Sequence, residues 1–307
     1  MPLPQWPKNS LPMRRSDLLF FALTALLFCS CARSGSSGTT LMVSIEPQRQ
    51  ILLALTGPDV QVTTMLKGSA DPETFEPTPS ARMAVDNAAV YFATGVLPFE
   101  EKLKASSAGG TAFADTSAGI DLIYGTHGDD DADDDDDDAD EDSHHRHRHS
   151  ADPHYWSSVT GLRAMARNMS AVLDSLMPDS AAATARRLAA LETRLDSVDA
   201  LVRRQLGGSS HAFAIWHPSL SFYARDYGLR QISVGVEGKE SSPRRIAAAI
   251  DSARAAGVEV LFVEAGTDRQ RSLAISDALG VPAVNINPLD ASWEKQLTDI
   301  AKAISHE

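Results

Sequence analysis

The sequence predicts an α/β fold of two lobes, each with a mainly parallel sheet, joined by one long rigid helix. Short apolar segments alternate with helical patterns, this alternation occurs twice, and a long amphipathic segment separates the two blocks. Strands that alternate with helices form parallel βαβ units. Ligands of such sheets bind outside the carboxyl ends of the strands. Two facing lobes therefore predict a binding site in the cleft between them.

The first block, residues 41–180, contains four predicted strands separated by helices. The segment 41–45 is a continuous apolar run except for Ser44, as expected of a buried strand, and 60–66 alternates between apolar and polar residues. The predicted strands are 41–45, 60–66, 90–95 and 111–116, and the predicted helices are 47–55, 81–89, 99–105 and 157–177. A loop rich in Pro, Gly and acidic residues occupies 67–80.

The linking helix and the second block follow. Apolar residues recur every three or four positions, which predicts a helix over 181–206 that ends at Gly207-Gly208. These apolar residues are Leu188, Leu191, Leu195, Val198, Leu201 and Val202. Residues 181–208 thus form the link, and 209–307 the second lobe. Its predicted strands are 213–216, 231–236, 258–263 and 281–286, and its predicted helices are 219–226, 243–256, 269–279 and 292–304.

Residues 1–31 have the features of an export signal. A basic start at 13–15 precedes an apolar stretch, 18–28, that is too short to span a bilayer. A small residue before Cys31 at its end is typical of a lipobox, although Phe28 is unusual at its position. Cys31 is the expected lipidation site, and an ordinary cleaved signal is the alternative. In either case the protein is exported to the cell envelope, on the periplasmic side, with 32–40 as a flexible tether.

The negative charge of the chain is local. Of the 41 acidic residues, 12 lie in 129–142, which leaves 29 acids against 28 bases elsewhere. This balance does not predict nucleic-acid binding. Both cysteines lie in the signal, so the exported chain is expected to have neither a disulfide nor a thiolate ligand.

Residues 127–150 form an acidic, His-rich loop that is expected to be disordered, because it has almost no apolar surface to bury. Imidazoles beside dense carboxylates attract divalent cations weakly at many points. The loop is therefore predicted to collect metal near the cleft, and a solvated linker without specific use is the alternative. The histidines concerned are His127, His144, His145, His147 and His149.

Nitrogen and oxygen donors follow the predicted strands of both lobes. Glu73 lies in the loop after the second strand, and His154 in the segment that follows the acidic loop. In the second lobe, His217 follows the first strand, Glu264 follows the third, and Asn287 follows the fourth. The carboxyl ends of parallel strands share one edge of a sheet, so these donors are expected to collect in the cleft.

Several short motifs in this order and spacing resemble the ZnuA-like solute-binding proteins of ABC importers for zinc and manganese. The resemblance covers essentially the whole exported chain, and an acidic, His-rich loop before the second motif marks the zinc-binding branch. The motifs are DPETFEPTPS at 71–80, DPHYW at 152–156, His217 with FYARDYGL at 222–229, SP at 242–243, FVE at 262–264 and NPL at 287–289.

The resemblance implies a metal held by donors from both lobes. The family uses a His in each DPH-type segment, a His or Glu at the start of the second lobe, and often an Asp before the final Pro-Leu. His154 and His217 match, whereas Glu73 and Asn287 occupy the other two positions. Glu73 is either a ligand or a turn cap, and Asn287 either a ligand or a turn former before Pro288. Glu264 either completes the ligand shell or holds a ligand His through its second nitrogen.

The expected function is therefore that of an exported, monomeric zinc receptor that performs no reaction. It is expected to deliver Zn²⁺ to the permease and ATPase of an ABC importer. Imidazole ligands favour zinc over manganese, and a manganese or iron receptor is the alternative within the family. A surface metal buffer or adhesin is a second alternative. A metal-dependent hydrolase is disfavoured because the sequence has no HExxH spacing.

Overall fold

The computed structural model describes residues 39–58, 60–68, 70–107, 110–125, 151–207, 211–235 and 242–305. The predicted signal with Cys31 and the histidine-rich loop (His127, His144, His145, His147 and His149) lie outside these ranges. Among the helices inside them, none is both long and apolar enough to cross a membrane.

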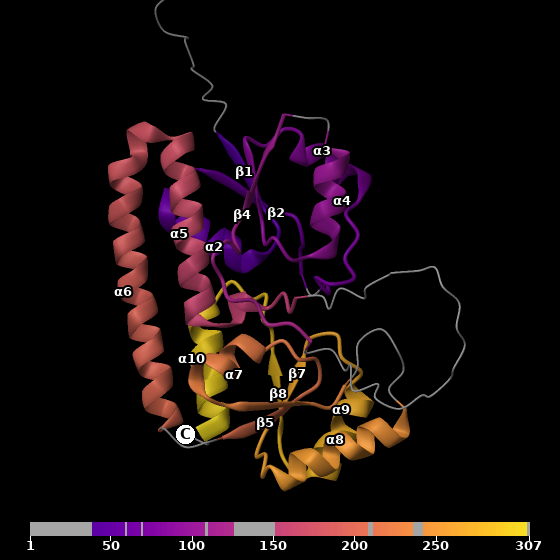
Figure 1. Cartoon of the computed structure of the whole chain (residues 1–307). Helices are drawn as coiled ribbons and strands as arrows, with labels where there is room; N and C mark the ends of the chain where they lie inside the picture. Colours follow the sequence, from indigo (N-terminus) through magenta and orange to yellow (C-terminus); the bar gives the residue numbers. More distant parts are fainter. Residues whose placement is uncertain are drawn as a thin grey trace, which may run out of the picture. The chain divides into compact units, whose positions relative to one another are not determined.

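The first lobe is a four-stranded parallel sheet covered by helices (Figure 1). Its strands are β1 (Thr40–Val43), β2 (Gln61–Thr64), β3 (Val90–Ala93) and β4 (Ala112–Asp115), in the order β2-β1-β3-β4. Its helices are α2 (Glu46–Thr56), α3 (Pro79–Val85) and α4 (Pro98–Ser106). β1 pairs with β2 on one side and β3 on the other, and Leu41, Met42 and Val43 are buried. A central strand covered on both faces has this continuous apolar pattern.

Helix α3 differs from its predicted range of 81–89. It begins earlier because Thr78 caps it, its hydroxyl accepting a hydrogen bond from the Ala81 N–H at 3.2 Å, and because Pro79 fits the first helical position. It ends at Val85 because the chain then turns into β3, where Ala89 N–H donates to Thr40 O at 2.9 Å.

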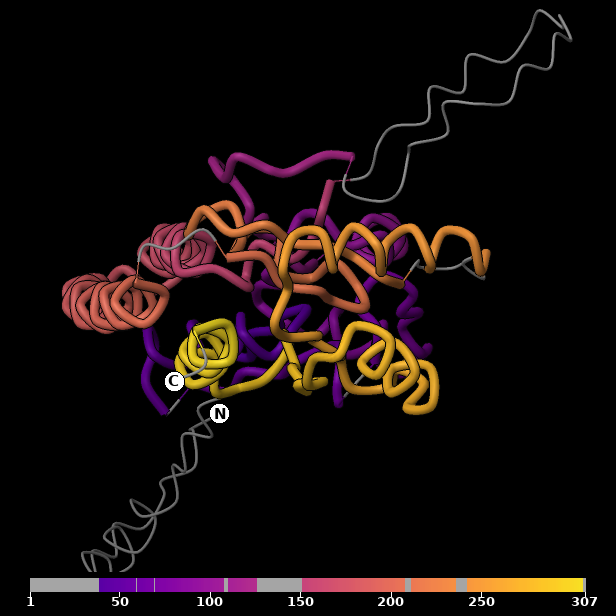
Figure 2. The backbone as a smooth tube through the Cα atoms, turned by 90° about the horizontal axis from the view of Figure 1, so that it is seen from below, coloured from indigo at the N-terminus to yellow at the C-terminus, as the bar shows by residue number. Residues whose placement is uncertain are grey.

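Two long helices connect the lobes. A 3₁₀ turn, η1 (Tyr155–Ser157), leads into α5 (Val159–Leu176), and a second turn, η2 (Pro178–Ser180), leads into α6 (Ala181–Leu206). Helix α6 has the predicted bounds and ends at Gly207, whose φ of 63° is left-handed and suits glycine. It packs along α5 and contacts both α2 of the first lobe and α10 (Trp293–Ser305) of the second. Figure 2 shows α5, α6 and α10 nearly end-on as neighbouring coils.

The second lobe repeats the strand order of the first. Its strands are β5 (Ala212–Ile215), β6 (Arg230–Ser233), β7 (Leu261–Glu264) and β8 (Ala283–Ile286), all parallel in the order β6-β5-β7-β8. Its helices besides α10 are α7 (Ser221–Tyr227), α8 (Pro243–Ala255) and α9 (Arg269–Leu279). The predicted α/β fold class with two parallel sheets is confirmed.

The two lobes share one hydrophobic core. On β5, Phe213 and Ile215 belong to a cluster that continues into the first lobe, whereas Ala214 faces a separate cluster with residues of α8 and α9. This alternation is that of a strand with both faces covered. The shared cluster includes β1, β3, α5, α6, α7 and α10. Close packing of this kind resists deformation, so it holds the strand ends of the two lobes in a defined relative position.

Candidate metal centre

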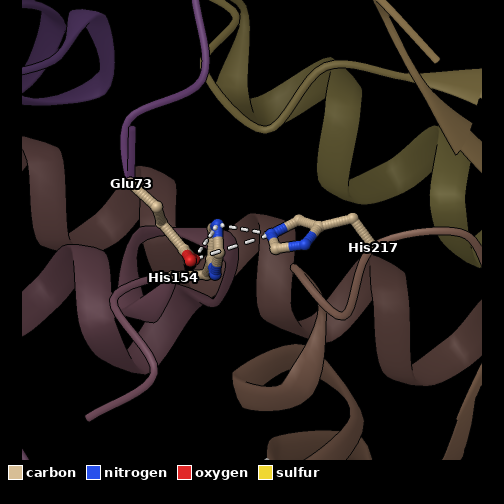
Figure 3. A group of neighbouring side chains, drawn as sticks. All are labelled: Glu73, His154 and His217. Carbon is tan, nitrogen blue, oxygen red and sulfur yellow. Dashed lines mark hydrogen bonds and ion pairs between the residues drawn. The ribbon is translucent and has the colours of Figure 1, made fainter. Parts of the chain in front are cut away.

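Three predicted donors meet between the lobes: Glu73, His154 and His217. The Nε2 atoms of the two histidines lie 3.3 Å apart, and Glu73 Oε1 lies 3.7 Å from each of them (Figure 3). One ligand atom from each residue falls within 4.8 Å of the others. The loop after β2, the segment before α5 and the turn after β5 each supply one donor.

These separations suit a tetrahedral metal. Bonds of about 2.0–2.1 Å from zinc to nitrogen, at tetrahedral angles, separate two ligand atoms by about 3.3–3.4 Å. The two imidazole nitrogens of His154 and His217 already stand at that separation, 3.3 Å. The carboxylate oxygen of Glu73 is slightly farther, at 3.7 Å from each. A single divalent ion can therefore contact all three donors with small side-chain movements.

Asp71 shapes the loop that carries Glu73. Its Oδ1 accepts the Glu73 N–H at 2.9 Å, and its Oδ2 accepts the Thr74 hydroxyl at 2.8 Å. Phe75, two residues after Glu73, packs edge-on against Phe99 of α4, with ring centroids 5.1 Å apart. The turn and this aromatic contact direct the Glu73 carboxylate into the cleft, where its side chain is 17% exposed.

His154 is buried and oriented by Asp152. Asp152 Oδ1 accepts the His154 backbone N–H at 2.9 Å and lies 2.9 Å from its Nδ1. Burial is the strongest influence on the Asp152 carboxyl and raises its pKa. Hydrogen bonds from His154 and Ser221, and the charge of His154, outweigh burial and keep this pKa below its usual value. In the neutral imidazole, a hydrogen on Nδ1 that donates to this carboxylate leaves the Nε2 lone pair directed to the cleft.

His217 stands at the end of β5. Trp216 N–H donates to Phe262 O at 2.9 Å, which ties this strand end to β7, and Ser219 N–H donates to His217 O at 2.8 Å. The ring of His217 meets that of His154 edge-on, with centroids 4.9 Å apart and planes at 69°. The strand end and its turn thus place an imidazole of the second lobe against one of the first.

Glu264 and Asn287 lie on the same cavity, of about 640 Å³, as the three donors. Glu264 does not belong to the cluster that the described Asp, Glu, His and Cys residues form, and it accepts a hydrogen bond from the Ser219 hydroxyl. Asn287 Oδ1 accepts the Leu289 N–H at 3.1 Å. This bond favours the turn-forming alternative for Asn287, although the residue lies on the cavity.

The role of Asp152 is a feature that sequence reasoning missed. Its carboxylate, fully buried, holds the His154 ring, a task considered for Glu264 from the sequence. The sequence pattern does indicate this role, because an Asp two residues before a His can accept the backbone N–H of that His, as in an Asx turn. The same reasoning identifies Asp71, two residues before Glu73.

Two α/β lobes with imidazoles and a carboxylate between their strand ends define a two-lobed binding protein whose site has the composition of a metal centre. The family model described as "ZnuA: Zinc-uptake complex component A periplasmic" matches residues 41–306. Because this match spans most of the sequence, the chain belongs to the ZnuA family, and the resemblance seen in its motifs is confirmed. This family is the zinc-binding receptor component of ABC uptake systems.

Curated relatives and a solved structure agree with this assignment. The high-affinity zinc uptake system protein ZnuA of Bacillus subtilis (strain 168) is 24% identical over 299 residues, covering 92% of this chain and 91% of that protein. The zinc-binding protein AdcA of Streptococcus pyogenes serotype M3 (strain ATCC BAA-595 / MGAS315) is 22% identical over 298 residues. That alignment covers 93% of this chain but 58% of AdcA, so the chain spans little more than half of that relative. A crystal structure of ZnuA superposes with a TM-score of 0.76 at 29% identity, covering 88% of this chain and 99% of the other.

Proposed function

We propose that this protein is an extracytoplasmic receptor that binds one Zn²⁺ between its lobes and delivers it to the permease and ATPase of an ABC importer. One observation carries the proposal: Glu73, His154 and His217 come from three distant segments, yet their ligand atoms lie within 4.8 Å of one another. Holding these polar groups together in the cleft, where they are partly or fully buried, costs free energy. A bound cation compensates this cost. Membership of the ZnuA family supports zinc as the cargo.

We assign Glu73, His154 and His217 as the ligands that the protein supplies. We propose that water or the side chain of Asn287, a residue of the same cavity, fills the fourth position. Glu264 supports the site from the second lobe through Ser219, which lies two residues after His217. Asp152 keeps His154 in the tautomer that a metal needs at Nε2.

Two imidazoles favour zinc over manganese, which prefers oxygen ligands. A specific observation keeps a manganese receptor as the second candidate, because Glu73 supplies an oxygen where the resemblance implies an imidazole nitrogen. Competition between Zn²⁺ and Mn²⁺ on the purified protein separates the two, and displacement of zinc by equimolar manganese would favour the second candidate.

We infer that the protein performs no reaction, since its family is a receptor component of an uptake system. Three protein ligands with an open fourth position are also found in catalytic zinc sites. Ester or peptide hydrolysis by the zinc-loaded protein that disappears in His154→Ala would contradict this inference.

Two further parts of the proposal rest on the sequence alone: the location of the protein, and weak zinc binding by the acidic loop. We propose that Cys31 carries a lipid that holds a monomeric body beside the membrane. The tether is the stretch after Cys31 that ends before β1, because Thr40, the last residue of the predicted tether, belongs to that strand. The histidines of the acidic loop then concentrate zinc near the cleft. Mass spectrometry of the exported protein tests the lipid on Cys31, and an unmodified cysteine, or its absence after cleavage, would argue for an ordinary signal.

Zinc titration of the exported chain tests the central proposal. One tightly bound ion per chain is expected, and it should be lost in His154→Ala and His217→Ala. Zinc-dependent growth of a host that lacks its own receptor, together with co-purification of the permease, distinguishes an importer from an adhesin or metal buffer. A chain that retains its tightest ion in both histidine variants would overturn the proposal.

A further inference from the structure

Tyr155, the residue after His154, binds the ends of two strands of the first lobe. Its hydroxyl donates to Thr94 O at 3.1 Å and lies 2.9 Å from Thr116 Oγ1. Thr94 directly follows β3 and Thr116 directly follows β4, and the Tyr155 side chain is fully buried. One phenol thus joins the residue beside a proposed ligand to two strands of the sheet.

The atoms that hold this phenol are themselves fixed by buried hydrogen bonds. Thr116 Oγ1 lies 2.8 Å from Ala93 O and 2.9 Å from Gln48 Nε2. Thr94 N–H donates to the carboxylate of Glu100 at 2.6 Å. A buried polar network whose members are satisfied is rigid, because each broken bond leaves an unpaired group in a low dielectric. The phenol is therefore attached to points that move little.

The backbone transmits this anchoring to His154. Tyr155 N–H donates to Pro153 O, and Ser157 N–H donates to His154 O, both at 2.9 Å. These bonds form the tight turn at η1, so the directions of the His154 and Tyr155 side chains are coupled. On the other side of the histidine, Asp152 N–H donates to Ile123 O at 2.8 Å. His154 is thus held from both sides.

We propose that Tyr155 is a positioning residue that sets the place of His154 Nε2 for metal binding. The inference rests on the proposed zinc site and deepens it, because it assigns a role to a residue that does not contact the ion. A metal site requires its ligands within about 0.5 Å and 10–20° of the productive geometry. Loss of the phenol anchor allows the turn at η1 to rotate, and the His154 nitrogen then departs from the 3.3 Å separation from His217.

Tyr155→Phe in the exported chain tests this role because it removes only the hydroxyl. The zinc dissociation constant should rise about tenfold, as for other partners outside the ligand shell. The visible spectrum of the Co²⁺-loaded protein should also change, since it reports the geometry of the ligands. The matched control is Tyr223→Phe: that phenol is equally buried and donates to Leu297 O at 3.0 Å, away from the site. It should lower the melting temperature but leave zinc affinity and the cobalt spectrum unchanged.

The outcomes separate the two proposals. If the wild-type chain binds no zinc at this site, the proposed function itself is wrong. If wild type binds zinc through His154 and Tyr155→Phe matches it in affinity and cobalt spectrum, only the positioning role is wrong. If Tyr155→Phe does not fold, Thr116→Val removes the other partner of the phenol and decides the matter. Weaker zinc binding in that variant supports the role, and unchanged binding overturns it.

Discussion

The Nε2 atoms of His154 and His217 lie 3.3 Å apart although 63 positions separate these residues in the chain. One imidazole belongs to a segment of the first lobe, and the other to the end of β5 in the second. Their distance is the ligand separation of a tetrahedral zinc ion, about 3.3–3.4 Å. The site therefore depends on how the lobes pack, and the shared hydrophobic core sets that packing.

Replacing either imidazole should abolish tight zinc binding. His154→Ala and His217→Ala each leave two of the three proposed ligands, so the loss of affinity should exceed the roughly 10–100-fold typical of residues outside the shell. His211→Ala is the control, because His211 contacts Leu206 O and lies outside the cluster. Chelator competition on the purified chain measures all three. Equal losses in the control and in the site variants would indicate a general effect on folding.

Asp152→Asn should weaken zinc binding about 10–100-fold, because the neutral amide holds the His154 ring less firmly. Asp268→Asn is a matched control, since Asp268 also accepts backbone N–H groups but caps α9.

The folded Asp152 pKa lies below its ordinary value of 3.8. The stability that its carboxylate contributes is therefore present above pH 3.8 and lost as pH falls through the lower folded pKa. Urea unfolding of the metal-free protein measures this, and a gap between wild type and variant that widens on acidification would contradict it.

Glu100→Gln should change the pH dependence of stability in the opposite sense. Burial raises the Glu100 pKa above 4.5, although hydrogen bonds from Ser44, Thr94 and Gly95 oppose the rise. Compared with the unfolded state, the folded state therefore favours the protonated Glu100 carboxyl. The stability that this preference contributes is complete below pH 4.5 and is lost as pH rises through the higher folded pKa. The unfolding free energy of wild type relative to Glu100→Gln should thus fall as pH rises above 4.5.

The exposed Glu76 provides the control for this experiment. Its hydrogen bond and ion pair with Lys102 lower its pKa. The unfolding free energy of wild type relative to Glu76→Gln should therefore rise with pH, whereas that relative to Glu100→Gln falls. The effect should be small because solvent screens an exposed pair. If the unfolding free energies of wild type and Glu100→Gln differ by the same amount at every pH, the pKa of the buried Glu100 carboxyl does not change on folding.

Gly161→Ala should disturb the η1 turn directly. A Cβ at Gly161 would lie 1.8 Å from Tyr155 O, so the backbone beside His154 must move. We expect a loss of stability of about 1–3 kcal/mol, as for other overpacked sites, together with weaker zinc binding. Gly110→Ala, where a Cβ meets nothing within 4 Å, should alter neither. Melting temperature and zinc competition measure both effects, and wild-type values for Gly161→Ala would show that the turn can adapt.

Deleting residues 128–149 should leave the tight site intact and remove additional, weaker zinc ions. Glu73, His154 and His217 all lie outside the deleted segment, whereas four of the five proposed loop ligands lie inside it. Zinc uptake should fall when the metal is scarce and recover when it is abundant. Unchanged uptake and unchanged metal stoichiometry would leave the loop as a linker.

The sequence by itself determined the order and type of the elements, including α6 at 181–206, because apolar periodicity is a local property. The motifs, through the family they resemble, also indicated His154 and His217. Only the tertiary structure decided which donors meet: Glu73 joins the two imidazoles, Glu264 contacts Ser219, and Asn287 caps its own turn. The physical reason is that a side chain's partner depends on packing across both lobes and on hydrogen bonds between distant segments, and neither leaves a periodic pattern in the chain.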